Sequence, residues 1–142
     1  MLPYKAGNFA KAEVEFAKLI SRAPEETELR FFMAVCQQEQ GNCIDAISNY
    51  EQVLKDSPDA HNAALNMGNC WYIEKEYEKA LFAYQIVRDI NPAYTRIFNP
   101  MAHMYYYLND TLNACVMLDS AAVYFADRDI DSGLRNACLS EN

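Results

Sequence analysis

The segment HNAALNMGNCWYIEKEYEKALFAYQIVRDINPAY, residues 61–94, contains small, aromatic and proline residues whose positions recur along the chain. Alanine returns every 34 residues, at Ala12, Ala46, Ala80 and Ala114. Proline keeps the same interval, at Pro24, Pro58 and Pro92. An aromatic or large apolar residue follows each alanine by four positions, at Phe16, Tyr50, Tyr84 and Leu118. A fixed period of this kind indicates one structural unit that is repeated about four times in the 142 residues.

The apolar spacing within each interval is that of an α-helix. In residues 43–54 the apolar positions recur at threes and fours, which predicts a helix with one apolar stripe. The stripe comprises Ile44, Ile47, Tyr50, Val53 and Leu54. A second helical run precedes it over residues 29–40, and Gly41 between the two readily adopts the left-handed conformation that ends a helix. Pro58 closes the second helix, since proline removes a hydrogen-bond donor and clashes with the preceding turn. The repeated unit is therefore predicted to be a helical hairpin.

The recurring residues resemble the tetratricopeptide repeat family, whose unit of 34 residues is helix–turn–helix. The third interval matches the family pattern at Ala64, Met67, Gly68, Trp71, Ala80, Tyr84 and Pro92. The second interval has Arg30, Met33, Ala34, Gln37, Ala46, Tyr50 and Pro58 at the same positions, and the fourth interval matches more loosely. In the fourth interval Ala126 stands where the proline is expected. The resemblance implies an all-α fold, a right-handed superhelical solenoid of antiparallel helix hairpins.

We expect a single domain over residues 1–142, with about three and a half repeats and a C-terminal capping helix. The expected divisions are a partial repeat (1–26), three repeats (27–60, 61–94 and 95–128), and the capping helix with its tail (129–142). The capping helix is suggested by Ile130, Leu134 and Cys138, spaced by four after the helix-capping types Asp127 and Asp129. Asn99 is expected to cap a late-starting helix that has Pro100 in its first turn.

The first repeat contains its second helix, predicted over residues 9–22, but only a few residues precede the turn. The apolar face of that helix, which includes Phe9, Ala12, Phe16 and Leu19, is then expected to be partly uncovered. Two interpretations follow. The chain is a fragment of a longer solenoid, which we favour, or another chain covers this face.

Composition narrows the class of partner. The chain carries 12 Lys and Arg against 20 Asp and Glu, a formal net charge of −8. Because the basic residues do not cluster, binding to nucleic acid is not expected. No stretch approaches the roughly 18 uninterrupted apolar residues of a membrane span. A protein or peptide partner is expected instead, with mild attraction to basic partners.

Most of the five cysteines are predicted to be packing residues. None forms a Cys-x-x-Cys pair, so the usual zinc and redox motifs are absent from the sequence. Cys36 and Cys70 occupy equivalent positions in successive repeats, as small core residues do. A reducing compartment fits this usage, and we expect a cytoplasmic location.

Catalysis is not expected, and neither is a metal or another cofactor. His61 and His103 fall in different repeats, with no serine or cysteine nucleophile placed to pair with them. Residues 127–131 resemble the start of a calcium loop, but the required glycine and bidentate glutamate do not follow. Residues 109–111 form a glycosylation triplet that is expected to serve as a helix-to-helix turn.

The resemblance implies a concave groove lined by the first helices of successive repeats, which commonly holds a peptide or a partner helix. The groove positions singled out here are Phe31, Val35, Asn62, Leu65, Asn66, Asn69, Tyr72, Arg96, Asn99 and His103. Asn66 and Arg96 match two positions of the carboxylate clamp of some members, but Phe31, Val35 and Pro100 replace its other residues. The clamp is therefore not expected.

Groove asparagines hold a peptide backbone in other members of the family, because an amide both donates and accepts hydrogen bonds. The alternative is that several of these asparagines are merely solvated surface residues, and the sequence leaves both interpretations open. The sequence favours a non-catalytic protein–protein interaction scaffold. A structural subunit that packs through its first repeat or its convex face into a larger complex is the alternative.

Overall fold

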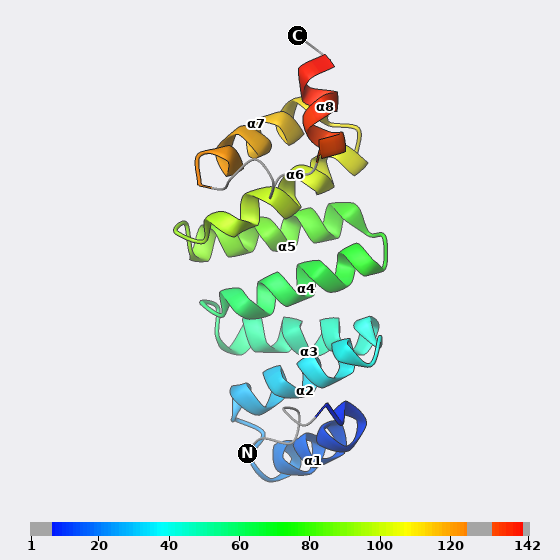
Figure 1. Ribbon diagram of the computed structural model, residues 1–142. Helices are drawn as coiled ribbons and strands as arrows, with labels where there is room; N and C mark the ends of the chain where they lie inside the picture. The colour runs from blue at the N-terminus through cyan, green and yellow to red at the C-terminus, as the bar shows by residue number, and fades with distance from the viewer. Residues whose placement is uncertain (1–6, 125–131, 141–142) are drawn as a thin grey trace. The chain divides into compact units, whose positions relative to one another are not determined.

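The computed structural model describes residues 7–124 and 132–140, and these residues form helices without any strand. The helices are α1 (Phe9–Arg22), α2 (Thr27–Glu39), α3 (Cys43–Asp56), α4 (His61–Ile73), α5 (Tyr77–Ile90), the 3-10 turn η2 (Thr95–Ile97), α6 (Phe98–Tyr107), α7 (Thr111–Ala122) and α8 (Ser132–Ser140) (Figure 1). The helices divide into two compact units, residues 1–76 and 77–142. None of the helices in the described ranges is long and apolar enough to cross a membrane.

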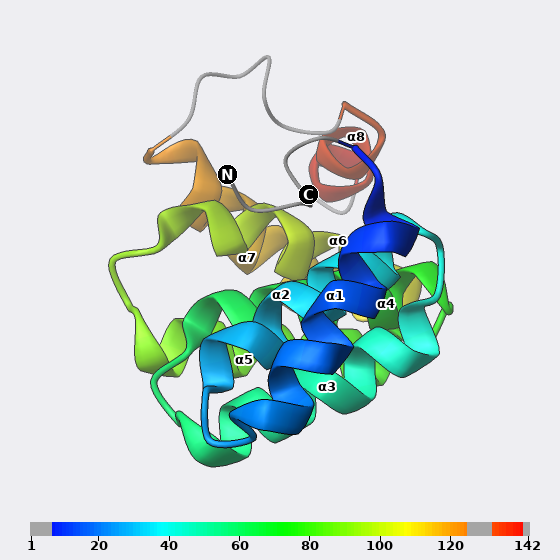
Figure 2. The ribbon, with the colours of Figure 1, turned by 90° about the horizontal axis from the view of Figure 1, so that it is seen from below.

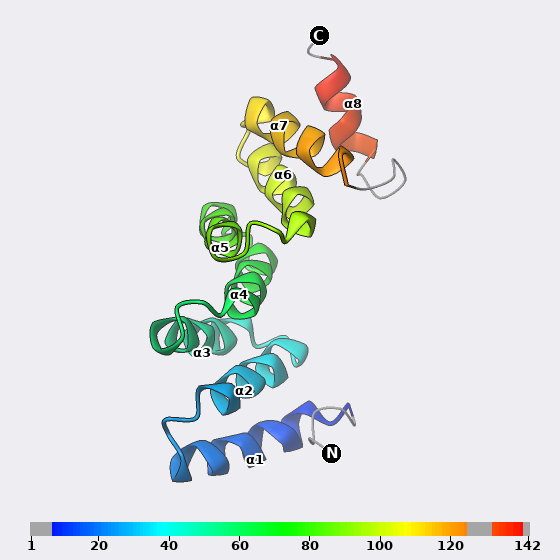
Figure 3. The same cartoon turned by 90° about the vertical axis from the view of Figure 1, so that its left-hand side faces the viewer.

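In the unit of residues 1–76, consecutive helices pack on one another, and α2 also contacts α4. Figure 3 shows α1 to α4 layered in chain order, and Figure 2 shows α1 lying against α2 from below. Ala12 and Phe16 of α1 are buried with Cys36 of α2. On the α1 face that was expected to be partly uncovered, Ala12 and Phe16 are therefore covered, whereas Leu19 keeps 42% of its surface exposed.

A left-handed residue recurs every 34 positions, and those after α2, α4 and α6 end the first helix of a hairpin. Gly7, Gly41, Lys75 and Asn109 have φ values of 71°, 80°, 61° and 59°. After α2, the N–H of Gly41 donates to the carbonyl of Gln38, and the N–H of Asn42 donates to that of Gln37. The same pair of bonds follows α4 and α6. This is the Schellman arrangement, which satisfies the last carbonyls of a helix and turns the chain back.

The recurring alanines and the residues that follow them form the core. Ala12, Ala46, Ala80 and Ala114 are completely buried. The companions four residues later, Phe16, Tyr50, Tyr84 and Leu118, are also buried. A small side chain allows close approach between helices, and the large one a turn later fills the adjacent space.

A polar network that the repeat pattern does not predict links α1, α2 and α3. Gln37 is buried, and its amide donates to Glu13 Oε1 at 3.0 Å. Its amide oxygen accepts from Asn49 Nδ2 at 2.8 Å, and Arg30 donates to Asn49 Oδ1 at 3.3 Å. Gln40 completes the network by donating to Glu13 Oε2 at 2.7 Å. Because every bond joins different helices or turns, the network stabilises the register of the first three helices.

In the unit of residues 77–142, α6 begins earlier than expected. The prediction that Asn99 caps this helix is wrong, because α6 starts at Phe98 and follows directly from η2. Pro100 does lie in the first turn, as predicted, where a residue without an N–H is tolerated. The 3-10 turn η2 therefore precedes the first turn of α6 in place of a side-chain cap.

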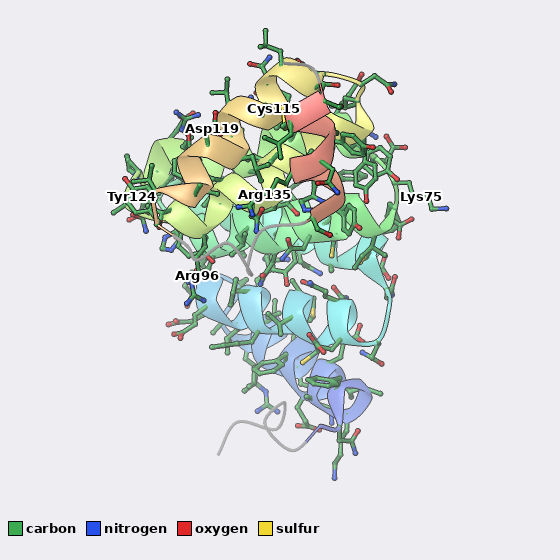
Figure 4. All side chains as sticks on the ribbon, turned by 45° about the horizontal axis from the view of Figure 1, so that its top comes forward. Lys75, Arg96, Cys115, Asp119, Tyr124 and Arg135 are labelled. Atoms are coloured by element: carbon green, nitrogen blue, oxygen red, sulfur yellow. A yellow bond between two sulfur atoms is a disulfide. The ribbon has the colours of Figure 1, made fainter. Side chains whose placement is uncertain are left out.

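The predicted capping helix corresponds to α8, which packs against α7 with Leu134 buried. Ile130, Asp127 and Asp129, also used in that prediction, lie outside the described residues. Cys115 lies on the side of α7 that faces α8 and forms a disulfide with Cys138, 23 residues later (Figure 4). The packing role predicted for the cysteines holds for Cys36, Cys43 and Cys70, which are free and buried, but not for this pair.

Replacing Lys75 with glycine is expected to stabilise the chain. A non-glycine residue at φ 61° costs about 1 kcal/mol, which glycine does not incur. Urea unfolding followed by circular dichroism should show a free energy of unfolding higher by up to that amount. Glu51→Gly, in the exposed interior of α3, is the control and should lower it by about 1 kcal/mol. A Lys75→Gly variant no more stable than the parent contradicts a strained turn.

Because two of the five cysteines form a disulfide, the denatured but unreduced protein should contain three titratable thiols. These are the thiols of Cys36, Cys43 and Cys70. Reduction should then release α8, because a cross-link over a loop of this length contributes about 3 kcal/mol. Amide hydrogen exchange in α8 should rise in dithiothreitol and in Cys138→Ser, and dithiothreitol should have no further effect on that variant. Five titratable thiols before reduction would show that the bond does not form.

Candidate binding faces

Two neighbouring helices of residues 1–76 carry seven of the ten predicted groove residues. Phe31 and Val35 lie on α2, which contacts α4. The members on α4 are Asn62, Leu65, Asn66, Asn69 and Tyr72. Asn62 and Tyr72 are exposed, and the other five are half-buried, so each presents an edge to the surface. The structure thus brings these seven together on adjacent helices of equivalent position in the repeat.

Phe31 is held by aromatic neighbours. Its ring packs edge-on against Phe32 at 5.7 Å and at a tilt against Tyr50 at 5.9 Å, measured between centroids. Edge-to-face and tilted pairs of this kind fix the ring orientation. The half-buried ring of Phe31 is therefore a preformed apolar surface rather than a mobile side chain.

Tyr50 connects the core to the asparagines of α4. Its hydroxyl donates to Gln38 Oε1 at 2.8 Å and also forms a hydrogen bond with the Asn66 side chain. Burial raises the pKa of the Tyr50 phenol, an effect that the Asn66 bond partly opposes, so the phenol stays protonated at neutral pH. The bond orients the Asn66 amide, which retains hydrogen-bonding capacity for a ligand.

A cavity of about 410 Å³ opens where α2 and α4 begin and α3 ends. Its lining residues are Thr27, Glu28, Phe31, Val53, Ser57, Asp59, Ala60, His61, Asn62 and Ala63. Phe31 and Asn62 therefore belong both to this cavity and to the predicted groove. His61 lines this cavity as well.

Sequence reasoning did not find this cavity, because Asp59 and Ser57 lie in the connection between two repeats. The 34-residue pattern describes the packing of the hairpins and carries no signal for the space beside such a connection.

The other three predicted residues belong to the unit of residues 77–142. Arg96 is in η2 and is exposed, as Figure 4 shows. Asn99 and His103 lie on α6 and are half-buried. The His103 ring is 6.4 Å from that of Tyr107, which stacks on Tyr77 at 4.8 Å.

A second cavity, of about 320 Å³, lies between α7 and α8 beside the disulfide. Leu118, Ala122 and Leu139 give it apolar walls, and Asp119 and Arg135 add one charge of each sign (Figure 4). Opposite charges in equal number give no preference for the charge of a ligand.

The buried thiols of residues 1–76 lie in surroundings that favour the protonated, unreactive form. Burial raises the pKa of Cys70, and a hydrogen bond with Cys43 raises it further. Burial also raises the pKa of Cys36, with smaller contributions from Glu13 and Glu39. Thiols kept protonated in this way are poor nucleophiles and poor metal ligands. Among the described residues, no three or more His, Cys, Asp or Glu side chains are grouped to hold a metal ion.

Helical hairpins of fixed length, closed by the same turn and packed through the same alanine, define a helical repeat protein. A model of the tetratricopeptide repeat family matches residues 37–94. The resemblance to that family is confirmed over these residues.

Solved structures with the same fold align with most of the chain. A crystal structure of MamA aligns over 96% of this chain and 86% of its own, with a TM-score of 0.82 at 16% identity. Residues 41 to the end of MamA from Desulfovibrio magneticus RS-1 align over 83% of this chain and 67% of that one, with a TM-score of 0.78 at 19% identity. A thermophilic tetratricopeptide protein of Thermus thermophilus aligns over 98% and 77%, with a TM-score of 0.68 at 19% identity.

These likenesses confirm the predicted all-α solenoid of helix hairpins as the fold class. No curated protein sequence matches the chain.

Tyr50→Phe tests the connection between the core and Asn66. Loss of the hydroxyl should cost about 1 kcal/mol of unfolding free energy, since it removes hydrogen bonds to Gln38 and Asn66. Gln38→Ala and the double variant complete a mutant cycle measured by urea unfolding. The two changes should be non-additive, and the side-chain amide resonances of Asn66 should shift in Tyr50→Phe. Strictly additive effects with an unmoved Asn66 resonance contradict the connection.

Proposed function

We propose that the chain is a non-catalytic scaffold that binds an extended peptide or a helix of a partner protein along the face formed by α2 and α4. The observation that carries this proposal is the Asn66 amide, held by Tyr50 next to half-buried apolar side chains.

The chemistry of the face suits a peptide backbone. An asparagine amide offers both donors and an acceptor, which a peptide bond can complement. Phe31, Leu65 and Tyr72 offer apolar area for partner side chains, as in other modes of peptide recognition. Hydrogen bonds to the backbone of the peptide provide affinity with little selectivity for its sequence. Selectivity then depends on pockets beside the face that bind particular side chains.

The partner class follows from charge and from the family. A net charge of −8 disfavours nucleic acid, whose phosphates require clustered basic residues. The proposed partner is a protein, and no cofactor is part of the proposal. A cytoplasmic location remains a prediction. Disulfides persist mainly in oxidising compartments, so the oxidation state of Cys115 and Cys138 in cells tests that location.

The alternative is a structural subunit that assembles through its first repeat. Val14 and Leu19 of α1 keep 54% and 42% of their surface exposed, which favours an apolar contact there. Crosslinks to partner chains confined to α1, with none to α2 or α4, would favour this alternative over the peptide-binding face.

The double variant Asn66→Ala/Asn69→Ala is expected to reduce capture of peptides from a pool of random 12-residue sequences by about tenfold or more. Two hydrogen-bonding amides lost from a partly desolvated face remove on the order of 1–3 kcal/mol. Retention of each peptide on the immobilised protein is the measurement. Asn136→Ala, an exposed asparagine of α8, is the matched control and should leave capture unchanged.

Circular dichroism and urea unfolding establish that the double variant is folded. Undiminished capture by the folded double variant contradicts the proposed face. Failure of the parent protein to capture any peptide contradicts the function itself.

A further inference from the structure

We infer that the cavity at the start of α2 and α4 binds a basic side chain, lysine or arginine, of the partner peptide. This inference deepens the proposed function and rests on it. Phe31 and Asn62 line both the cavity and the proposed face, so a peptide on that face passes the cavity mouth. The cavity thus gives sequence selectivity to a face whose asparagines recognise backbone.

The charges of the lining select a cation. Glu28 and Asp59 each contribute a carboxylate, and the ten lining residues include no lysine or arginine. The first turns of α2 and α4 also lie at the cavity and oppose these charges, because a helix N-terminus carries roughly half a positive charge. Two full negative charges outweigh two such partial charges, so the cavity is left with about one net negative charge.

The apolar part of the lining fits the stem of a long basic side chain. Val53, Ala60 and Ala63 line the cavity beside the Phe31 ring. Lysine and arginine bury their methylene groups on such surfaces while keeping the charged end at polar groups. A cation over the Phe31 face gains a further electrostatic attraction, and the Asn62 amide oxygen is an acceptor for a guanidinium or ammonium.

The size and the wider electrostatics agree with this occupant. A volume of about 410 Å³ lies in the lower part of the roughly 300–1,000 Å³ range of ligand sites. The net charge of −8 draws basic segments toward the chain. The cavity beside α8 has one charge of each sign and no such preference.

The test is an NMR titration of the uniformly ¹⁵N-labelled chain with N-acetyl-arginine methylamide. Its neutral isostere, N-acetyl-citrulline methylamide, and the anionic N-acetyl-aspartate methylamide are titrated in parallel. Arginine should shift the backbone amides of Thr27, Glu28, Asn62 and Ala63, and citrulline should bind several-fold more weakly. Raising the salt concentration should weaken only the arginine effect, since exposed charge pairs are screened.

Variants assign the effect to the two carboxylates. Glu28→Gln/Asp59→Asn should weaken arginine binding by about threefold to thirtyfold, the range for two partly exposed ion pairs. Glu25→Gln/Glu51→Gln removes two exposed carboxylates that do not line the cavity and should change binding little. Glu28→Gln/Asp59→Asn should also abolish the enrichment of lysine and arginine among the peptides captured from the random pool.

The outcomes separate this inference from the proposed function. Equal binding of arginine and citrulline, preferential binding of the aspartate derivative, or no shift at the cavity amides overturns the inference, whereas peptide capture is measured independently. Captured peptides without basic enrichment overturn it as well. If arginine binds but no peptide is captured, the cavity holds a free cationic ligand, and the peptide occupant proposed here is wrong.

Discussion

The left-handed turn that recurs every 34 residues is the constraint on which the other features depend. The turns at Gly41, Lys75 and Asn109 each close a helix through the same pair of backbone bonds and reverse the chain at a fixed point. The buried alanine, five residues after the turn residue, then always falls at the same place in the following helix. A change in this interval by one residue would rotate that helix by about 100° and expose its core side chain. The period is therefore a backbone requirement as well as a sequence pattern.

Residues that satisfy this requirement were predictable, because they repeat. The helix from Phe9 to Arg22 has the predicted bounds, and the glycine at position 41 has the expected positive φ. Lys75 and Asn109 show that the geometry persists where glycine is replaced. The start of α6 was expected two residues too late, because a 3-10 turn took the place of an Asn99 cap.

Features formed by residues that do not recur from repeat to repeat were not predictable from the sequence. The Cys115–Cys138 pair joins two helices whose approach depends on packing at the end of the chain, and neither cysteine has a counterpart that repeats. The Gln37 network likewise depends on Glu13 and Asn49, which come from different helices. The cavity at the start of α2 and α4 is lined partly by the connection between two repeats, and the repeat pattern constrains such connections least. Sequence periodicity thus predicted the scaffold and only part of the candidate site.

Within residues 1–76, the residues that recur every 34 positions and those that do not recur contribute differently to the candidate site. The repeated aromatic Tyr50 of α3 packs against Phe31 of α2 and forms a hydrogen bond with Asn66 of α4. The non-repeated Glu28 and Asp59 add charge beside the same helices. A general backbone-binding face next to a charged pocket would allow a common fold to distinguish among partners.

The most direct measurement is a chemical-shift map of the ¹⁵N-labelled chain with a peptide selected from the random pool, recorded for backbone and asparagine side-chain amides. A peptide bound as proposed shifts the side-chain amides of Asn66 and Asn69 and the backbone of α2 and α4. Shifts confined to α1 around Val14 and Leu19, with Asn66 and Asn69 unmoved, would contradict the proposed face.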